Sequence, residues 1–141
     1  MQLRLKYEPT PENASRFAAD VVASASSVSG VKLDYTPDSL VLVDGIFDDF
    51  RSDGVSGRQI AETLFGFGCY VGEVLTRHAG GQWRAVGDAE LAVGGWPLVV
   101  ELAAGRLCNP IGKAFKRLEN DGPEDSLRHF YTVFAATPPA Q

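Results

Sequence analysis

The chain has 141 residues, of which 45% are hydrophobic and 22% are charged, and its formal net charge is −5. This length fits a single domain with its own core, and the composition is that of an ordinary globular protein. The acidic balance argues against non-specific binding to DNA or RNA, because the neutralisation of phosphates requires clustered Lys and Arg.

Cys69 and Cys108 are the two cysteines of the chain, and both stand in apolar stretches without a C-x-x-C spacing. We therefore expect reduced, buried thiols, and neither a disulfide framework nor a zinc or redox site. Residues 1–13 lack the continuous apolar region of a signal peptide, and no apolar run approaches the roughly 20 residues of a membrane span. These patterns predict a cytoplasmic protein that binds no membrane.

The N-terminal part of the chain is predicted to form a strand and then a helix. In residues 2–7, QLRLKY, polar and apolar side chains alternate with a period of two, which is typical of a half-buried strand at a sheet edge. Thr10 and Pro11 suit the cap and the first position of a helix, in which apolar residues recur at spacings of three and four as far as Val28. Residues 31–35 follow as a short extended link or strand.

Two further helices are predicted next. Thr36 and Pro37 provide a cap and a first helical residue for a helix with one apolar face. Ser56 and Gln59 then have the S-x-x-Q spacing of a capping box, which predicts the start of a central helix over 57–78.

The pattern then changes to short apolar segments separated by turn residues, at 82–86, 91–93, 96–102 and 106–109. This spacing predicts a small antiparallel β-meander of three to four strands. The loop Ala103-Ala104-Gly105 suits a three-residue hairpin connection with its glycine in the left-handed conformation.

Two helices end the predicted fold. Asn109 is a helix cap with Pro110 in the first position, and after a glycine break a last helix begins at Pro123. Residues 137–141 are expected to be a disordered tail. Segregated strands and helices indicate a single α+β domain over 1–136, in which the antiparallel meander packs against helices.

The stretch FGFGCYVG at 65–72 holds three glycines and resembles a phosphate-binding loop. In a dinucleotide loop G-x-G-x-x-G follows a strand, but here the third glycine comes one residue late and the preceding segment is helical. A P-loop ends in G-K-[ST], whereas Glu73 follows Gly72. We therefore interpret the stretch as part of the central helix, buried on more than one side, in which Gly68 and Gly72 let neighbouring segments come close.

Glu73 lies in the middle of this helix and has two interpretations. Its spacing of four from Arg77 favours a surface ion pair beside Glu62 and Arg58. The alternative is a partly buried carboxylate that faces a cleft.

An acidic segment covers residues 36–53. Its aspartates are interpreted as a solvated helix face and not as a metal site, because the spacing of an EF-hand loop is missing. The residues concerned are Asp44, Asp48, Asp49 and Asp53.

A basic turn follows Asn109 and contains Lys113, Lys116 and Arg117. At the start of a helix such a turn is able to bind an anion. The favoured interpretation is a polar helix face whose charges balance Glu119 and Asp121, because most surface charges only solvate the fold.

The remaining chemistry-bearing residues have weaker signals. His78 and His129 lack the spacing of a metal or protease motif, and no local signature pairs either of them with Cys108 as a nucleophile. Trp83 and Trp96 flank the meander and are expected to fill the core, with a place in a ligand groove as the alternative.

Three segments resemble a family of small bacterial proteins of unknown function that is abundant in actinomycetes: GCYVGEVLTRHAGGQW at 68–83, WPLVVELAAGRLCNPIGKAFKRLEN at 96–120, and EDSLRHFY at 124–131. The loop at 119–122 is one residue longer than the family pattern leads us to expect. The resemblance implies a bacterial cytosolic α+β domain and supplies no activity. It directs attention to Glu73, Trp83, Asn109, Lys113 and Asp125.

Two functions are consistent with these patterns. The first is a non-catalytic binding or interaction module whose partner is another protein or a second copy of the chain, without nucleic acid, metal or cofactor. The second is a small enzyme or anionic-ligand-binding domain, which requires Glu73 and the basic turn from Asn109 to Arg117 to converge on one pocket. No catalytic residue is assigned. The candidate binding residues are Glu73, Trp83, Asn109, Lys113, Arg117 and Asp125.

Overall fold

The computed structural model describes residues 4–87 and 96–136 of the chain. The helices are α1 (Ala14–Ser29), α2 (Ser39–Ser52), α3 (Ala61–His78), α5 (Pro110–Glu119) and α6 (Leu127–Ala135). The strands are β1 (Gln82–Ala85), β2 (Leu98–Glu101) and β3 (Leu107–Cys108). Short 3-10 turns lie at Pro11–Asn13, Ala103–Gly105 and Pro123–Asp125. The predicted α+β fold, a small antiparallel sheet packed against helices, is confirmed.

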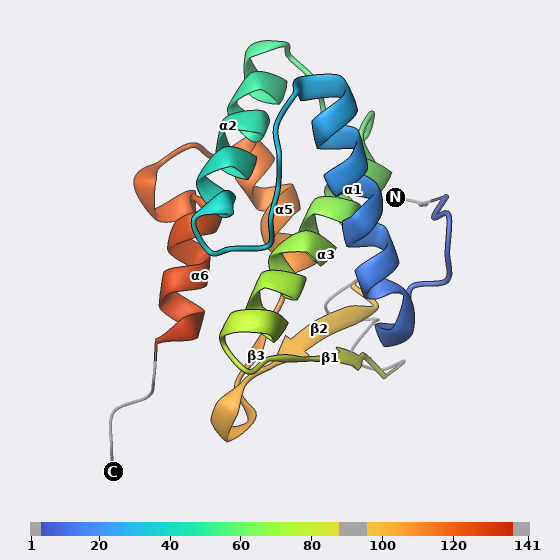
Figure 1. The fold of residues 1–141 in the computed structure, drawn as a ribbon, viewed down its shortest axis with the longest axis vertical. Helices are drawn as coiled ribbons and strands as arrows, with labels where there is room; N and C mark the ends of the chain where they lie inside the picture. The colour runs from blue at the N-terminus through green and yellow to red at the C-terminus, as the bar shows by residue number, and fades with distance from the viewer. Residues whose placement is uncertain (1–3, 88–95, 137–141) are drawn as a thin grey trace.

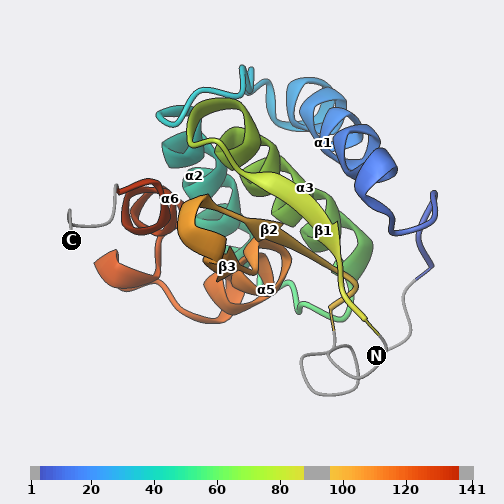
Figure 2. The same ribbon diagram turned by 90° about the horizontal axis from the view of Figure 1, so that it is seen from below.

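Helix α3 is the centre of the molecule. In Figure 1 α1 lies on one side of α3, α2 and α6 lie on the other side, and the strands cross near its C-terminal end. The view from below in Figure 2 shows β1, β2 and β3 side by side, with helices behind them. Helix α3 packs against α1, α5 and α6 and against both longer strands. None of the helices in the described ranges has the length and apolarity needed to cross a membrane.

The composition of α3 explains its central place, since every residue from Leu64 to Leu75 is buried. Three glycines within this run let three neighbouring elements approach the helix axis. A Cβ at each of them would collide with a neighbour: at Gly66 with Val21 of α1, at Gly68 with the backbone of Ile111 of α5, and at Gly72 with the ring of Trp83 of β1. The prediction that Gly68 and Gly72 make room for close neighbours is confirmed.

The sheet has the order β1-β2-β3 with antiparallel pairing throughout, as predicted for the meander. Val100 is its central residue, because it pairs with Trp83 on one side and with Cys108 on the other. Gly105 has a φ of 73°, the left-handed conformation expected for the hairpin, and Ala104 before it has a φ of 62°. The strand predicted at 91–93 lies outside the described residues.

The strand predicted over residues 2–7 is wrong for the part that the structure describes, because residues 4–7 form no strand. Their apolar side chains pack on helices instead, and the ring of Tyr7 meets that of Phe17 edge-on with 5.1 Å between centroids. The alternation of polar and apolar residues suits any segment with one buried side, so a period of two does not require a partner strand. Residues 31–35 form the extended link and not a strand.

The predicted start of the central helix at residue 57 is early, since α3 begins at Ala61. The capping box does form. The Ser56 N–H donates to Oε1 of Gln59 over 2.9 Å, and the Gln59 N–H donates to Oγ of Ser56 over 3.3 Å. These bonds close a separate turn ahead of α3, so the signature is correct and the boundary is displaced by one turn.

Candidate functional site

A pocket of about 420 Å³ opens where the beginning of α5 meets the segment before β2 and the helix α6. Its walls come from three parts of the chain that are distant in sequence. The lining residues are Trp96, Asn109, Gly112, Lys113, Phe115, Lys116 and Phe130.

The side chain of Asn109 is oriented by its role as the cap of α5. Its Oδ1 accepts a hydrogen bond from the Gly112 N–H over 2.9 Å, and its backbone oxygen accepts one from the Lys113 N–H over 3.0 Å. Because the amide oxygen is held by the helix, the amide nitrogen Nδ2 must be the free end of the side chain. Asn109 is thus a donor to whatever occupies the pocket.

Gly112 brings a second donor beside the first. A Cβ at this position would stand 2.5 Å from Nδ2 of Asn109 and 3.1 Å from Nε1 of Trp96. The two N–H groups therefore converge on one small region of the pocket wall, and only glycine leaves them room. Within residues 4–87 and 96–136, neither nitrogen donates a hydrogen bond to a protein acceptor.

Aromatic rings and lysines complete the pocket. The rings of Trp96 and Phe115 pack with 4.6 Å between centroids at an angle of 39°, and Phe130 comes from α6. Lys113 is half-buried and Lys116 is exposed. Burial lowers the pKa of Lys113, against the opposing attraction of Asp125 and Asp44. Among the lining residues that the structure describes, the polar side-chain groups that are not already bonded are all donors, and two of them carry positive charge.

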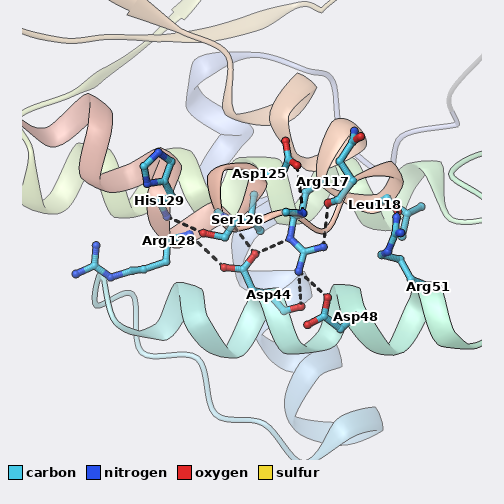
Figure 3. A network of polar contacts seen from close by, with 12 residues as sticks. Asp44, Asp48, Arg51, Arg117, Leu118, Asp125, Ser126, Arg128 and His129 are labelled. Atoms are coloured by element: carbon cyan, nitrogen blue, oxygen red, sulfur yellow. Dashed lines mark hydrogen bonds and ion pairs between the residues drawn. The ribbon is translucent and has the colours of Figure 1, made fainter.

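Arg117, expected in the basic turn, points away from the pocket into a separate network between α5, α2 and α6 (Figure 3). Its side chain is only 4% exposed, and it donates from Nε to Asp44 over 2.9 Å and from Nη2 to Asp48 over 2.7 Å. Burial opposes its charge, but the hydrogen bonds that it donates to Asp48 and Asp44 and the attraction of these two carboxylates outweigh burial and raise the pKa of Arg117. Its charge is balanced by these aspartates, and not by Glu119 and Asp121 as the sequence predicts.

The interpretation of Asp44 as part of a solvated face is wrong, because its side chain is 13% exposed and fully engaged. Besides the bond from Arg117, Oδ1 accepts from the Leu127 N–H over 2.9 Å and Oδ2 accepts from the Arg128 N–H over 3.2 Å. These two N–H groups belong to the first residues of α6. The carboxylate of Asp44 on α2 thus binds both α5 and α6 (Figure 3). Asp48, Asp49 and Asp53 do lie on the exposed side of α2 or just after it. The described residues contain no group of three or more His, Cys, Asp or Glu able to hold a metal ion.

Glu73 is buried, with 7% of its surface exposed, so the favoured interpretation of a surface ion pair is wrong. Its Oε2 accepts a hydrogen bond from Nε1 of Trp83 over 2.9 Å, and its Oε1 accepts one from Arg77 over 3.4 Å. The guanidinium of Arg77 in turn stacks over the ring of Tyr35 at 3.6 Å. The expected pairing with Arg77 exists, but it belongs to a cluster that also binds Trp83 and does not line the pocket.

The predicted site residues thus separate into three places. Glu73 and Trp83 bind each other, Arg117 joins the aspartates of α2, and Asn109 and Lys113 line the pocket. Asp125 accepts a hydrogen bond from the Gly122 N–H over 3.2 Å in the turn before α6, where its charge favours the ammonium of Lys113.

The sequence favoured the core for Trp96, with a ligand groove as the alternative, and it did not indicate Phe130 as a pocket residue. Phe115 and Gly112 were not singled out. A local signal exists for Gly112 alone, because it stands three residues after the Asn109 cap, where the capping side chain bonds. The aromatic rings reach the pocket from separate segments of the chain, and no spacing within one segment predicts that they lie together.

Among the described residues, no contact pairs a cysteine thiol with a histidine ring as a nucleophile and its base. Cys69 and Cys108 are free and buried, and burial raises the pKa of Cys108 to about 12 and that of Cys69 further. Thiols in such surroundings stay protonated and unreactive at neutral pH. Nε2 of His78 lies 2.9 Å from the backbone oxygen of Tyr35, and His129 is exposed on α6.

Comparison of the chain with models of known protein families, with curated proteins and with solved structures found no match in any of the three.

Proposed function

We propose that the protein is a cytoplasmic, non-catalytic binding module that holds a small anion in the pocket at the beginning of α5. The observation that carries this proposal is the convergence of the Asn109 amide and the Trp96 indole N–H over Gly112, beside Lys113. Donors without protein acceptors at a pocket wall need acceptor atoms from a ligand or from water.

Charge selects an anion for this place. The lysines of the pocket are cations, and Lys113 is partly removed from water, where an ionic attraction is stronger than at an open surface. A neutral or cationic ligand would leave that half-buried ammonium with only the attraction of Asp125 and Asp44 against the cost of burial. The pocket volume of about 420 Å³ lies within the usual range of small-molecule sites, roughly 300–1,000 Å³.

The lining of the pocket also favours binding of a ligand over catalysis. Among the residues that the structure describes, the lining side chains include no carboxylate, hydroxyl, thiol or imidazole. They therefore supply no carboxylate or imidazole general base and no Ser, Thr or Cys nucleophile. Glu73, the carboxylate that the enzymatic alternative needs, is occupied by Trp83 and Arg77 and is not a lining residue. These features support the binding module over the enzyme.

The test is a titration of ¹⁵N-labelled protein with acetate, hexanoate, benzoate and inorganic phosphate, followed by the backbone amide signals of residues 109–116. We expect at least one of these anions to saturate shifts in that segment. Lys113→Gln should weaken its binding by about tenfold, as for the loss of a charged hydrogen-bond partner. Lys32→Gln is the matched control, because it removes the same charge from an exposed lysine that does not line the pocket.

The proposal fails if none of the four anions reaches saturation in the α5 segment. It also fails if Lys32→Gln weakens binding as much as Lys113→Gln, because the attraction would then come from net charge and not from the pocket.

A further inference from the structure

The pocket specifies more than the sign of the ligand charge. We infer that it is built for a planar aromatic carboxylate, a flat ring that carries one carboxylate directly or through a short link. This inference rests on the proposed function and names the class of anion within it.

The first step concerns the polar end of the ligand. The Nδ2 of Asn109 and Nε1 of Trp96 both lie within 3.1 Å of a single point at Gly112. A group that accepts from both must present two lone pairs, or two oxygens, within a small span. A carboxylate does this with two coplanar oxygens, and Lys113 at the same wall neutralises its single charge.

The second step separates a carboxylate from a phosphate. Phosphate sites use several backbone N–H groups at a helix start, or a bidentate arginine. Here the N–H groups of Gly112 and Lys113 are already bonded to the side chain and backbone of Asn109. Arg117, the arginine of this helix, is committed to Asp44 and Asp48. Within the described part of the chain, the pocket therefore lacks the backbone N–H groups and the arginine of a phosphate site, and its one half-buried cation, Lys113, matches a single negative charge, since Lys116 is exposed.

The third step concerns the body of the ligand. Trp96, Phe115 and Phe130 supply the apolar lining, and the first two are tilted by 39°. A flat ring gains apolar burial and also favourable edge or face contacts with these aromatic side chains, which add to what a saturated chain obtains from burial alone. The polar donors and the aromatic side chains line the same pocket, so a ligand that uses both must carry its ring and its carboxylate in one small molecule.

The NMR signals of the indole N–H groups test the proposed ligand class directly. The chain contains two tryptophans, and Trp83 donates its N–H to Glu73, so its signal serves as an internal reference. Benzoate, phenylacetate and indole-3-acetate are titrated while both indole ¹H–¹⁵N signals are followed. Cyclohexanecarboxylate is the control for a saturated ring, benzamide for an uncharged ring, and inorganic phosphate for an anion without a ring.

We expect the Trp96 signal to shift to saturation with an aryl carboxylate while the Trp83 signal stays in place. The best aryl carboxylate should bind roughly tenfold more tightly than cyclohexanecarboxylate. Asn109→Asp should weaken binding by about tenfold or more, because an aspartate still caps α5 but replaces the amide donor with a negative charge. Trp96→Phe keeps a ring and removes the N–H, and it should weaken binding severalfold.

Two results overturn this inference and leave the proposed function standing. One is that hexanoate, cyclohexanecarboxylate or phosphate binds as tightly as any aryl carboxylate, still with dependence on Lys113. The other is that an anion binds with dependence on Lys113 while Asn109→Asp changes nothing. If no anion moves either the Trp96 signal or the α5 amides, the inference and the proposed function fail together. Far-UV circular dichroism and the Trp83 signal show that each variant has folded.

Discussion

Arg117 and Asp44 are 73 positions apart in the sequence, and their side chains meet over 2.9 Å inside the protein. The same carboxylate accepts the Leu127 and Arg128 N–H groups at the start of α6. One ion pair therefore connects α5, α2 and α6, and it holds in place the helix that supplies Phe130 to the pocket.

Arg117→Met should destabilise the fold by about 3–5 kcal/mol, because it leaves the Asp44 charge buried without its cationic partner. The measurement is the free energy of unfolding in urea. Asp48→Asn is the matched control, since that carboxylate binds the same guanidinium but is 59% exposed and should cost less than about 1 kcal/mol. Equal effects of the two changes would contradict the importance of burial here.

Gly72→Ala should destabilise the fold by about 1–3 kcal/mol, because the new methyl group would collide with the ring of Trp83. Gly45→Ala on α2 is the opposite case. Its Cβ would meet open space, so the better helix propensity of alanine should stabilise the fold by up to about 1 kcal/mol. Thermal unfolding of the two variants measures both signs. A stabilising Gly72→Ala would show that β1 does not depend on this close approach.

Glu73→Leu should destabilise the fold by about 1–3 kcal/mol, because the indole N–H of Trp83 would lose its acceptor in a largely buried place. Glu73→Gln keeps an acceptor oxygen at the same position and should cost clearly less. Chemical unfolding gives the stabilities, and the exchange rate of the Trp83 indole proton reports the bond directly. If both variants lose the same stability, the charge and not the hydrogen bond is what matters.

Stability should decline in alkaline solution because of the buried thiols. Burial raises the pKa of Cys108 from an ordinary value of 9.0 to about 12, and that of Cys69 in the same direction. A raised pKa in the folded state means that the stabilising contribution is complete below pH 9 and is lost as the pH rises toward 12. Each thiol then lowers the free energy of unfolding by up to about 1.4 kcal/mol per pH unit.

The measurement is urea unfolding between pH 8 and pH 10.5, with Cys69→Ala as the comparison. That variant should be less stable at neutral pH because of its cavity, yet it should have a shallower alkaline slope. A thiol reagent should also leave both cysteines of the folded protein unmodified at pH 8 and react with them once urea unfolds it. Identical slopes for the two proteins would contradict the assignment to Cys69.

The features that could be predicted are those encoded by neighbours in the chain. Helical periodicity, the Asn109 cap with Pro110, the Ser56–Gln59 capping box and the glycine of the 103–105 hairpin each depend on interactions within a few residues. The α+β arrangement followed from the order of these elements, and the glycines of α3 indicated close packing because a central helix otherwise has little reason to carry them.

The wrong predictions have a common cause, because a local sequence pattern does not indicate which distant segment will pack against it. The alternation at 2–7 indicated a buried side, but packing on α1 satisfied it without a strand. Asp44 and Glu73 were taken for surface residues, because polar side chains at such spacings are usually solvated. Each is buried because a donor from a remote segment reaches it: Arg117 from α5 and Trp83 from β1.

The sequence by itself determined the helices, the antiparallel meander that follows the central helix and the class of the fold, since propensity, capping and periodicity act over one or two turns. Only the tertiary structure decided which polar groups are committed and which are free. Arg117 and Lys113 stand four residues apart on one helix, yet one is neutralised by α2 and the other faces a pocket with Trp96 and Asn109. Burial and pairing depend on contacts between segments that are distant in the sequence and come together only when the chain folds. The candidate site is formed by such segments.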